Sequence, residues 1–431
     1  MKTYQDLMSV NESEIGKFCI SAIQDFMSTQ EYKASKEGEA YYNKHNTTIE
    51  AFQKFIYTLT GNRVVDIYSA NYKLKTLFFR RLVTQQVQYV LGNGLTLQES
   101  ENKQKLGRDF DFQLQKAAKR AMSSGQAFGF WNYDHLEVFG YADTNHDPGF
   151  CPLYDEETAE LAAGIRYWFK RVGNKTLTRF TLYEADGYTE YCKNIEDEIE
   201  VVQEKRKYKT ITTSLQGQII VDSVGENYNR LPIVPLYAND AHESELVGIR
   251  ESIDCYDLIK SGLADNIDDS SEIFWLLKNT GGMDDIELAK FLQRIKTVHG
   301  AVVDGEGDGN ASAEAHTMQI PTEARRTMLE LLRSDIYEDF QALDVKTLSA
   351  AAKTTQEIQA AYQSQDNKCA DFEYLVIDFV QQILSLAGID DEPSFTWNRV
   401  VNIQEQTNTI LSAANYLDDE TLIKKLPFLT P

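Results

Sequence analysis

Residues 231–280 read LPIVPLYANDAHESELVGIRESIDCYDLIKSGLADNIDDSSEIFWLLKNT, and this stretch decides the fold. A short strand pattern with two prolines passes into one long helical pattern over 243–278. Apolar residues recur there every three or four positions, at Leu246, Ile249, Ile253, Tyr256, Ile259, Leu263 and Ile267. At 1.5 Å per residue the pattern predicts a helix roughly 50 Å long. Its single apolar stripe is too narrow for a helix surrounded by core, so we expect it to pack along one side.

The polar side of this predicted helix is acidic. We take five of its acids as one exposed face: Glu251, Asp254, Asp257, Asp265 and Asp268. Asp254 and Asp257 lie within one turn and could form a carboxylate pair for acid–base chemistry. A solvated acidic face explains the same spacing without chemistry, and we favour it.

Composition and net charge limit the classes of function that the sequence allows. The chain has 431 residues, 42% hydrophobic residues and a formal net charge of −23, enough for two to four domains. A protein that grips phosphate backbones over a wide surface needs clustered Lys and Arg, so the charge argues against one. It leaves open a protein through which nucleic acid slides. No apolar run predicts a signal peptide or a membrane span. Five scattered cysteines predict reduced thiols and synthesis in the cytoplasm.

The chain before this helix predicts helices followed by a sheet. Helical patterns cover the first forty residues, 71–91 and 108–125, and glycines follow the last two. Aromatic and β-branched runs between 127 and 222 then predict an antiparallel sheet. The charged run 194–207 is interpreted as a hairpin tip or loop. The fold class is therefore α+β.

The chain after this helix predicts a small insertion and two more long helices. Residues 279–320 combine a helical pattern with two strand patterns, and Pro321 opens a helix to about residue 345. A further helix begins at Thr354 and ends at Gly388. One more strand, FTWNRVV at 395–401, and a closing pair of helices over 402–431 complete the prediction.

Candidate chemistry is sparse. Asp304, Glu306 and Asp308 have the alternation of the first EF-hand ligands, but position twelve of that loop would be Ala315. We favour an acidic glycine-rich turn over a cation site. The six histidines show no ligand spacing, and no P-loop or GxSxG motif occurs. Aromatic residues at 131–141 and 167–191 could stack on bases, but without basic clusters they fit a sheet core better. We therefore expect no enzyme, no metal and no cofactor.

The order of these parts resembles the portal protein of tailed bacteriophages, in its long-tailed-phage form. The resemblance covers nearly the whole chain. It is strongest in 231–269, including Asp254, Asp257 and Asn266, and the other similar segments are EGEAYYNKHNTTI (37–49), NYKLKTLFFRRLVTQQVQYVLGNGL (71–95), MSSGQAFGFWNYD (122–134) and ETLIKKLPFL (420–429). None of them is a catalytic signature, so the specificity comes from their order and spacing.

The resemblance implies a portal fold with named parts. The wing would be 1–242, the two stem helices 243–278 and 321–345, and the α/β clip 279–320. A tunnel loop would occupy 346–353, a long wing helix and strand 354–401, and a helical crown 402–431. The loop's sequence KTLSAAAK separates two long helices, which suits a protruding element, although an ordinary interhelical loop is the alternative.

The resemblance also implies a function. The protein would form a homo-oligomeric ring, normally of twelve subunits, at one vertex of the capsid of the virion. Double-stranded DNA would pass through its channel during packaging and ejection, without sequence specificity. The partners would be the large terminase, the head–tail adaptor, the scaffold and the major capsid protein, and no membrane.

Particular residues receive roles from the same resemblance. The tunnel loop would present Lys346, Thr347, Ser349 and Lys353 to DNA, and the clip would contact terminase and adaptor through Asp284, Asp285, Lys296, His299 and Asp304. The acids of the stem would make a poorly adhesive channel wall, because they repel phosphates. The rival hypotheses are another neck or adaptor ring, which would not need both stem helices and a clip, and a Mg²⁺-dependent nucleic-acid enzyme.

Overall fold

The structure of the protein is a computed structural model. It describes residues 1–57, 61–67, 69–144, 147–173, 175–194, 196, 198–209, 212–215, 218–221, 225–270, 274–278, 286, 290, 293, 312–316, 321–346, 355–399 and 411–412. Two compact units divide the chain. The large unit comprises Met1–Thr47, Thr76–Ile253 and Ser334–Pro431, and the small unit comprises Thr48–Lys75 and Asp254–Arg333.

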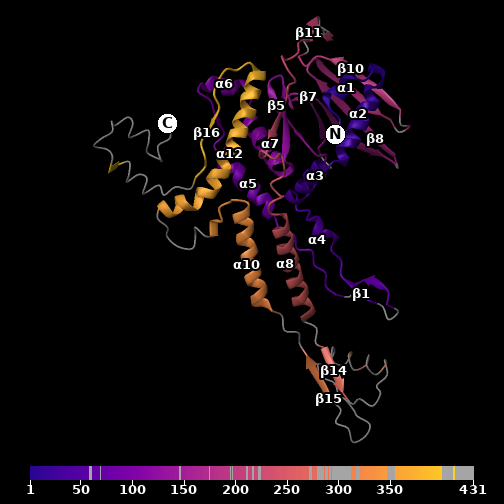
Figure 1. Ribbon diagram of the computed structural model, residues 1–431, viewed down its shortest axis with the longest axis vertical. Coiled ribbons are helices and arrows are strands. Elements are labelled where there is room, and N and C mark those ends of the chain that lie inside the picture. The colour runs from indigo at the N-terminus through magenta and orange to yellow at the C-terminus, as the bar shows by residue number, and fades with distance from the viewer. Residues whose placement is uncertain are drawn as a thin grey trace. The chain divides into compact units, whose positions relative to one another are not determined.

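Helices and strands fall mostly in separate runs of the described chain, as an α+β fold requires: helices up to α7, then strands β4 to β13, then helices α8, α10 and α12 (Figure 1). The helices are α1 (Tyr4–Met8), η1 (Glu12–Glu14), α2 (Ile15–Ser28), α3 (Gln30–Tyr42), α4 (Thr47–Ala51), α5 (Phe78–Leu91), α6 (Ser100–Lys105), α7 (Phe110–Ser124), α8 (Arg250–Ser270), α10 (Thr322–Asp339) and α12 (Thr355–Ala387). The strands are β1 (Phe55–Tyr57), β2 (Arg63–Val65), β3 (Leu95–Thr96), β4 (Gln126–Asn132), β5 (His135–Gly140), β6 (Gly149–Tyr154), β7 (Leu161–Val172), β8 (Lys175–Glu184), β9 (Gly187–Lys193), β10 (Ile199–Arg206), β11 (Thr212–Leu215), β12 (Gln218–Val221), β13 (Ile233–Tyr237), β14 (Phe274–Lys278), β15 (Ser312–His316) and β16 (Ser394–Phe395).

The large unit is built on an eight-stranded sheet in the order β10-β9-β8-β7-β6-β5-β4-β13. Neighbouring strands are antiparallel except β5 and β6, which pair in parallel through Gly140 and Gly149. Strand β13 closes the edge beside β4, so Pro235 of LPIVPLY lies opposite Phe128. An edge strand tolerates the proline's missing N–H.

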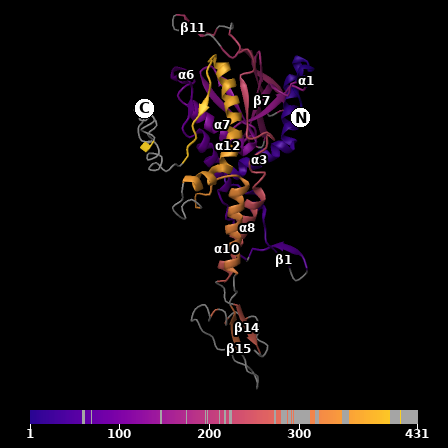
Figure 2. The ribbon, with the colours of Figure 1, turned by 60° about the vertical axis from the view of Figure 1, so that its left-hand side comes forward.

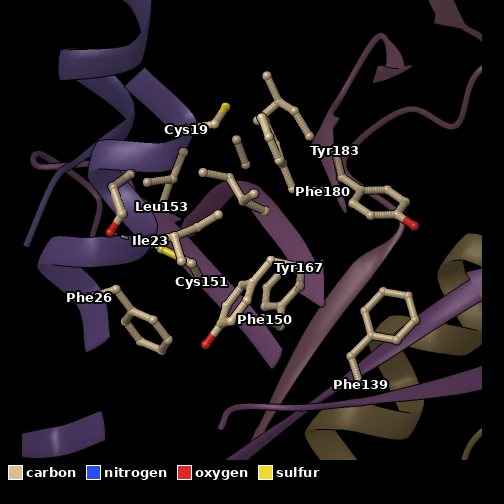
Figure 3. Packing of buried hydrophobic residues seen from close by; sticks show 14 of the residues in the cluster. Cys19, Ile23, Phe26, Phe139, Phe150, Cys151, Leu153, Tyr167, Phe180 and Tyr183 are labelled. Atoms are coloured by element: carbon tan, nitrogen blue, oxygen red, sulfur yellow. Dashed lines mark hydrogen bonds between the residues drawn. The ribbon is translucent and has the colours of Figure 1, made fainter. Parts of the chain in front are cut away.

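Aromatic and aliphatic side chains from α2 fill one face of this sheet (Figure 3). Ile23 and Phe26 of α2 belong to the same buried cluster as Phe150, Tyr167 and Phe180 of the strands. Complete burial of a phenylalanine contributes about 2–3 kcal/mol relative to exposure. This packing explains the aromatic strand pattern without any base stacking.

Helix α12 packs against β13 and β4 of the same sheet (Figure 1 and Figure 2). Gly129 of β4 allows this approach, because a Cβ atom there would lie 2.4 Å from Cζ of Phe379. The helix ends where the sequence predicted, at Gly388, whose φ of +70° suits glycine. The starts of α10 and α12 also lie within one residue of their predicted positions.

The predicted helix over 243–278 is too long. Residues 245–249 form turns, α8 begins only at Arg250, and Phe274–Lys278 is a strand paired with β15. The backbone before α8 bonds to the end of α7 instead: Glu245 N–H donates to the Met122 carbonyl at 3.0 Å, and the Ser244 hydroxyl donates to the Ser123 carbonyl at 2.6 Å. These contacts across the chain replace the helical bonds that periodicity predicts.

Three further expectations differ from the structure. The helix predicted from residue 71 begins at Phe78, the charged run at 194–207 contains strand β10, and FTWNRVV contributes only Phe395 to a strand, the two-residue β16. Strand β10 pairs with β9 over Ile199–Arg206, so its charged residues lie on an edge strand of the sheet rather than in a loop. The predicted closing helices, and the predicted helix and first strand of 279–320, fall largely outside the described residues.

Candidate assembly and channel site

The acids of α8 differ in exposure. Glu251 and Asp268 are exposed and Asp254 is half-buried. Asp257 is completely buried, and Asp265 is only 3% exposed. The predicted acidic face is therefore wrong for Asp257 and Asp265, whose carboxylates are not presented to solvent.

The physical reason is a segment far away in sequence. We call residues 48–75, which belong to the small unit, the arm. Lys54 of the arm places its Nζ atom 2.9 Å from an Asp265 carboxylate oxygen. The other Asp265 oxygen accepts a hydrogen bond from the backbone N–H of Tyr72 at 2.7 Å. One buried carboxylate thus holds both sides of the arm, and charged hydrogen bonds of this kind are stronger than neutral ones.

Further polar residues of α8 contact the arm on either side of Asp265. Ser261 Oγ accepts from Leu74 N–H at 3.0 Å, and Asp254 accepts from the Thr48 hydroxyl at 2.7 Å. The Tyr72 hydroxyl lies 3.4 Å from Asp268, a long contact. Backbone groups that donate to side chains of α8 cannot donate within a helix, which explains why 71–77 is not helical.

Asn266, a residue of the resembling segment, links α8 to α10. Its amide oxygen accepts from Arg325 Nη1 at 3.1 Å and from Nη2 at 2.7 Å, while its nitrogen donates to the Gly262 carbonyl at 3.3 Å. A planar guanidinium supplies both donors from one group. A cleft of about 220 Å³ lies among these residues, lined by Ile49, Phe52, Lys54, Asn71, Tyr72, Lys73, Leu258, Ser261, Gly262, Asp265, Asn266 and Arg325.

The arrangement in the small unit is structural. The polar groups of the cleft described above bind one another, and the carboxylate of Asp265 has two donors. No group of three or more His, Cys, Asp or Glu side chains is placed to hold a metal ion within the described ranges. The contacts therefore hold chain segments together.

In the large unit, the chain that leads to the predicted tunnel loop is anchored by two helices. Gln85 of α5 donates to the Leu343 carbonyl at 2.9 Å, and Lys368 of α12 donates to the Phe340 carbonyl at 2.9 Å. Exposed Lys346 follows, its N–H bonded to Asp344 Oδ1 at 3.1 Å. Nothing in the hydrophobic periodicity pointed to Gln85 or Lys368, because both bond to backbone carbonyls distant in sequence.

The remaining predicted site residues lie outside the described part of the chain. These are Thr347, Ser349 and Lys353 of the tunnel loop and Asp284, Asp285, Lys296, His299 and Asp304 of the clip. The roles given to them stay predictions.

A second cleft, of about 630 Å³, lies in the large unit. Glu39 lines it beside Arg120, Lys116 and Lys119. Burial raises the pKa of Glu39 to about 7, and the nearby Arg120 opposes that rise. This titrating carboxyl was not predicted, because Glu39 stands in a polar run (EGEAYY) that gives no sign of burial.

Other side chains agree with a structural protein. All five cysteines are free, and Cys19, Cys151 and Cys369 are buried. Burial raises the pKa of the Cys19 thiol, which keeps it protonated and unreactive. Among the helices that the structure describes, none combines the length and hydropathy needed to cross a bilayer.

Comparison with known proteins agrees with the resemblance. Residues 27–431 match the phage portal protein family described as SPP1 Gp6-like. The portal protein of Clostridium phage phiCD119 is 25% identical over 415 residues, which cover 90% of this chain and 88% of that protein. The portal protein of Bacillus phage SPP1 is 22% identical over 347 residues, 79% of this chain and 66% of that relative, just under two thirds of its length.

A solved structure, the neck of an empty GTA particle computed with C6 symmetry, contains a chain with a TM-score of 0.46 and 9% identity, matched over 83% of this chain and 91% of that one. The family match covers every segment on which the resemblance rests, and it includes α3, α8, α10 and α12. The chain therefore belongs to the SPP1 Gp6-like family of phage portal proteins, a family of structural virion components rather than enzymes.

Proposed function

We propose that this protein forms a closed ring, normally of twelve subunits, at one vertex of a phage capsid. DNA would enter the head through the ring's channel during packaging and leave through it during ejection. The observation that carries the proposal is the family match over residues 27–431. The two similar proteins named as portal proteins support it, although each is at most 25% identical.

The parts of the ring follow the boundaries predicted above. The stem lies within 243–278 and 321–345, except that strand β14 (Phe274–Lys278) pairs with β15 of the clip and would belong with it. The clip is 279–320, the tunnel loop 346–353 and the crown 402–431, with the remainder as wing. Helices α8 and α10 fall within the two stem segments, and α12 falls within the long wing helix. The clip docks the large terminase during packaging and the head–tail adaptor afterwards, and the wing and crown contact scaffold and major capsid protein.

Charge supports passage of DNA rather than retention. A chain with a net charge of −23, multiplied around a ring, repels phosphates wherever its exposed acids face the channel. Within α8, Glu251 and Asp268 remain exposed for this purpose, whereas Asp257 and Asp265 serve the fold. Lys346, and Lys353 with it, would touch phosphates transiently as DNA passes. Such contacts carry no base information.

The mass of the assembled particle tests the proposal. Twelve chains of 49.1 kDa give a ring of about 590 kDa, which mass photometry separates from a monomer. We expect a closed species near that mass, and no cleavage when it is incubated with plasmid DNA and Mg²⁺. A protein that stays monomeric at every concentration and cuts the plasmid would instead favour the nucleic-acid enzyme.

A further inference from the structure

The arm carries a two-stranded ribbon with one apolar face. Strands β1 and β2 are antiparallel, with Phe55 opposite Val65 and Tyr57 opposite Arg63. Side chains alternate between the faces of a strand, so these four residues share one face. The Arg63 guanidinium lies over the Phe55 ring, 3.7 Å from its centroid, and places one positive charge on that face.

The apolar side chains of this face are substantially exposed. Tyr57 is 75% exposed, Val65 45% and Phe55 41%, and nearby Ile67 is 79% exposed. Exposed apolar side chains that lie together on a surface often mark a site of interaction with another molecule. A two-stranded ribbon on its own is only marginally stable in water. A partner that covers the face would give the ribbon the packing it lacks.

The base of the arm is fixed while the ribbon stays open. Lys54, next to β1, is paired with Asp265, and Lys75 at the end of the arm is paired with Glu50 at 2.5 Å. The ribbon has no third strand among the described residues of the small unit, so both its edges are available. A held base with an uncovered ribbon is suited to reach a neighbouring molecule.

The helices of the same unit carry apolar residues that match this need. Leu258 of α8 is 42% exposed, and Met328 and Leu331 of α10 are 40% and 55% exposed. We call these three residues the stem patch. A helix of a soluble protein normally turns such residues inward, so these partly exposed side chains are candidates for a contact with another molecule, while Leu258 also lines the cleft beside the arm.

Charge identifies the partner. The arm has four basic and two acidic residues, a net charge of +2, in a protein of net charge −23. Helix α8 has two basic and six acidic residues, a net charge of −4. Two copies of so acidic a chain repel unless a basic region of one meets an acidic region of the other. Lys54 and Lys75 are already paired within the chain, so Arg63 on the ribbon face and an exposed acid of α8 such as Glu251 are the charges that would meet between copies.

We propose that the ribbon face formed by Phe55, Tyr57, Arg63 and Val65 packs on the stem patch of the adjacent copy of the same chain. The contact is heterologous, because different surfaces of the two copies meet, and repetition of such a contact closes a ring when the rotation permits. The inference rests on the proposed ring and specifies how neighbouring small units are joined in it.

Photo-cross-linking on the assembled full-length protein tests this contact. Benzoylphenylalanine is introduced at Tyr57, and that chain is assembled with an excess of isotopically heavy wild-type chain. After irradiation we expect light–heavy cross-links to the tryptic peptides 251–260 and 327–333, which contain the stem patch. Benzoylphenylalanine at Tyr374 of α12, 73% exposed, is the matched control and should give neither product.

Weakened variants supply an independent readout. Tyr57→Ser and Val65→Thr should each raise the protein concentration needed for half assembly at least tenfold, whereas Tyr374→Ser should leave it within twofold. Two results would overturn the arm contact while leaving the portal ring intact. One is normal ring assembly by Tyr57→Ser; the other is that benzoylphenylalanine at Tyr57 cross-links only within one chain or to other peptides. Absence of any large oligomer in the wild type would contradict the ring itself.

Discussion

Replacement of Asp265 by alanine tests whether α8 holds the arm through this one carboxylate. Asp265 is 3% exposed, lies 2.9 Å from Lys54 Nζ and accepts the Tyr72 N–H at 2.7 Å. Loss of a hydrogen bond to a charged acceptor costs about 1.5–3 kcal/mol. Lys54 remains partly exposed and also donates to the Ala70 carbonyl, so its share is about 1 kcal/mol.

The sum gives about 3 kcal/mol for detachment of the arm, which corresponds to roughly a hundredfold change in an equilibrium constant. Hydrogen exchange measured by mass spectrometry reports local opening directly, and it does not require two-state unfolding of a large protein. We expect the Tyr72 amide of Asp265→Ala to exchange roughly a hundredfold faster than in the wild type. Asp265→Asn keeps an acceptor and should fall between the two.

Asp268→Ala is the matched control, because Asp268 is an exposed acid on the same helix whose contact with the Tyr72 hydroxyl is long, at 3.4 Å. Its effect on the Tyr72 amide should stay below about threefold, since exposed contacts contribute little. The reasoning is refuted if Asp265→Ala and Asp268→Ala accelerate exchange equally, or if neither changes it.

Three other perturbations have defined outcomes. Arg325→Ala should lower the local stability of α10 by about 1–2 kcal/mol, because Asn266 loses its guanidinium partner, and amide exchange along α10 should become about tenfold faster. Arg325→Lys should not restore the protection, because one ammonium cannot reproduce the two guanidinium hydrogen bonds. The raised pKa of Glu39 means that the folded protein holds this proton to higher pH than the unfolded chain, so the free energy of unfolding should fall as the pH rises from about 4.5 to 7. The thermal midpoint of Glu39→Gln should lack that fall. Parallel pH profiles of the variant and the wild type would contradict the assignment. Gly129→Ala would force a Cβ to 2.4 Å from Phe379 and should cost about 1–3 kcal/mol, seen as a lower thermal midpoint, whereas Gly248→Ala meets nothing within 4 Å and should be neutral.

Local signals in the sequence predicted the elements that depend on them. Pro321 marked the start of α10, Gly388 the end of α12 and Gly125 the end of α7, because proline and glycine act through the backbone at their own positions. Aromatic and β-branched runs predicted the sheet because these residue types favour strands locally. These features need no knowledge of which distant segments meet.

The failures share a different cause, which is contact across long stretches of chain. Asp265 belongs to an acidic face by periodicity, yet Lys54 and Tyr72, about two hundred residues earlier, bury it. The start of α8 was placed too early because Glu245 bonds to the end of α7. Burial of Asp257 and Glu39 likewise follows from neighbours that the local pattern does not show. A single sequence contains no record of those neighbours.

The central claim concerns assembly into a ring with an open axis. Electron microscopy of the purified full-length protein, with class averages viewed down the particle axis, tests it most directly. The account predicts a turbine-shaped ring of about twelve or thirteen subunits with closed cyclic symmetry around a central hole. Particles without a central hole, or a preparation that remains monomeric and cleaves DNA, would contradict it.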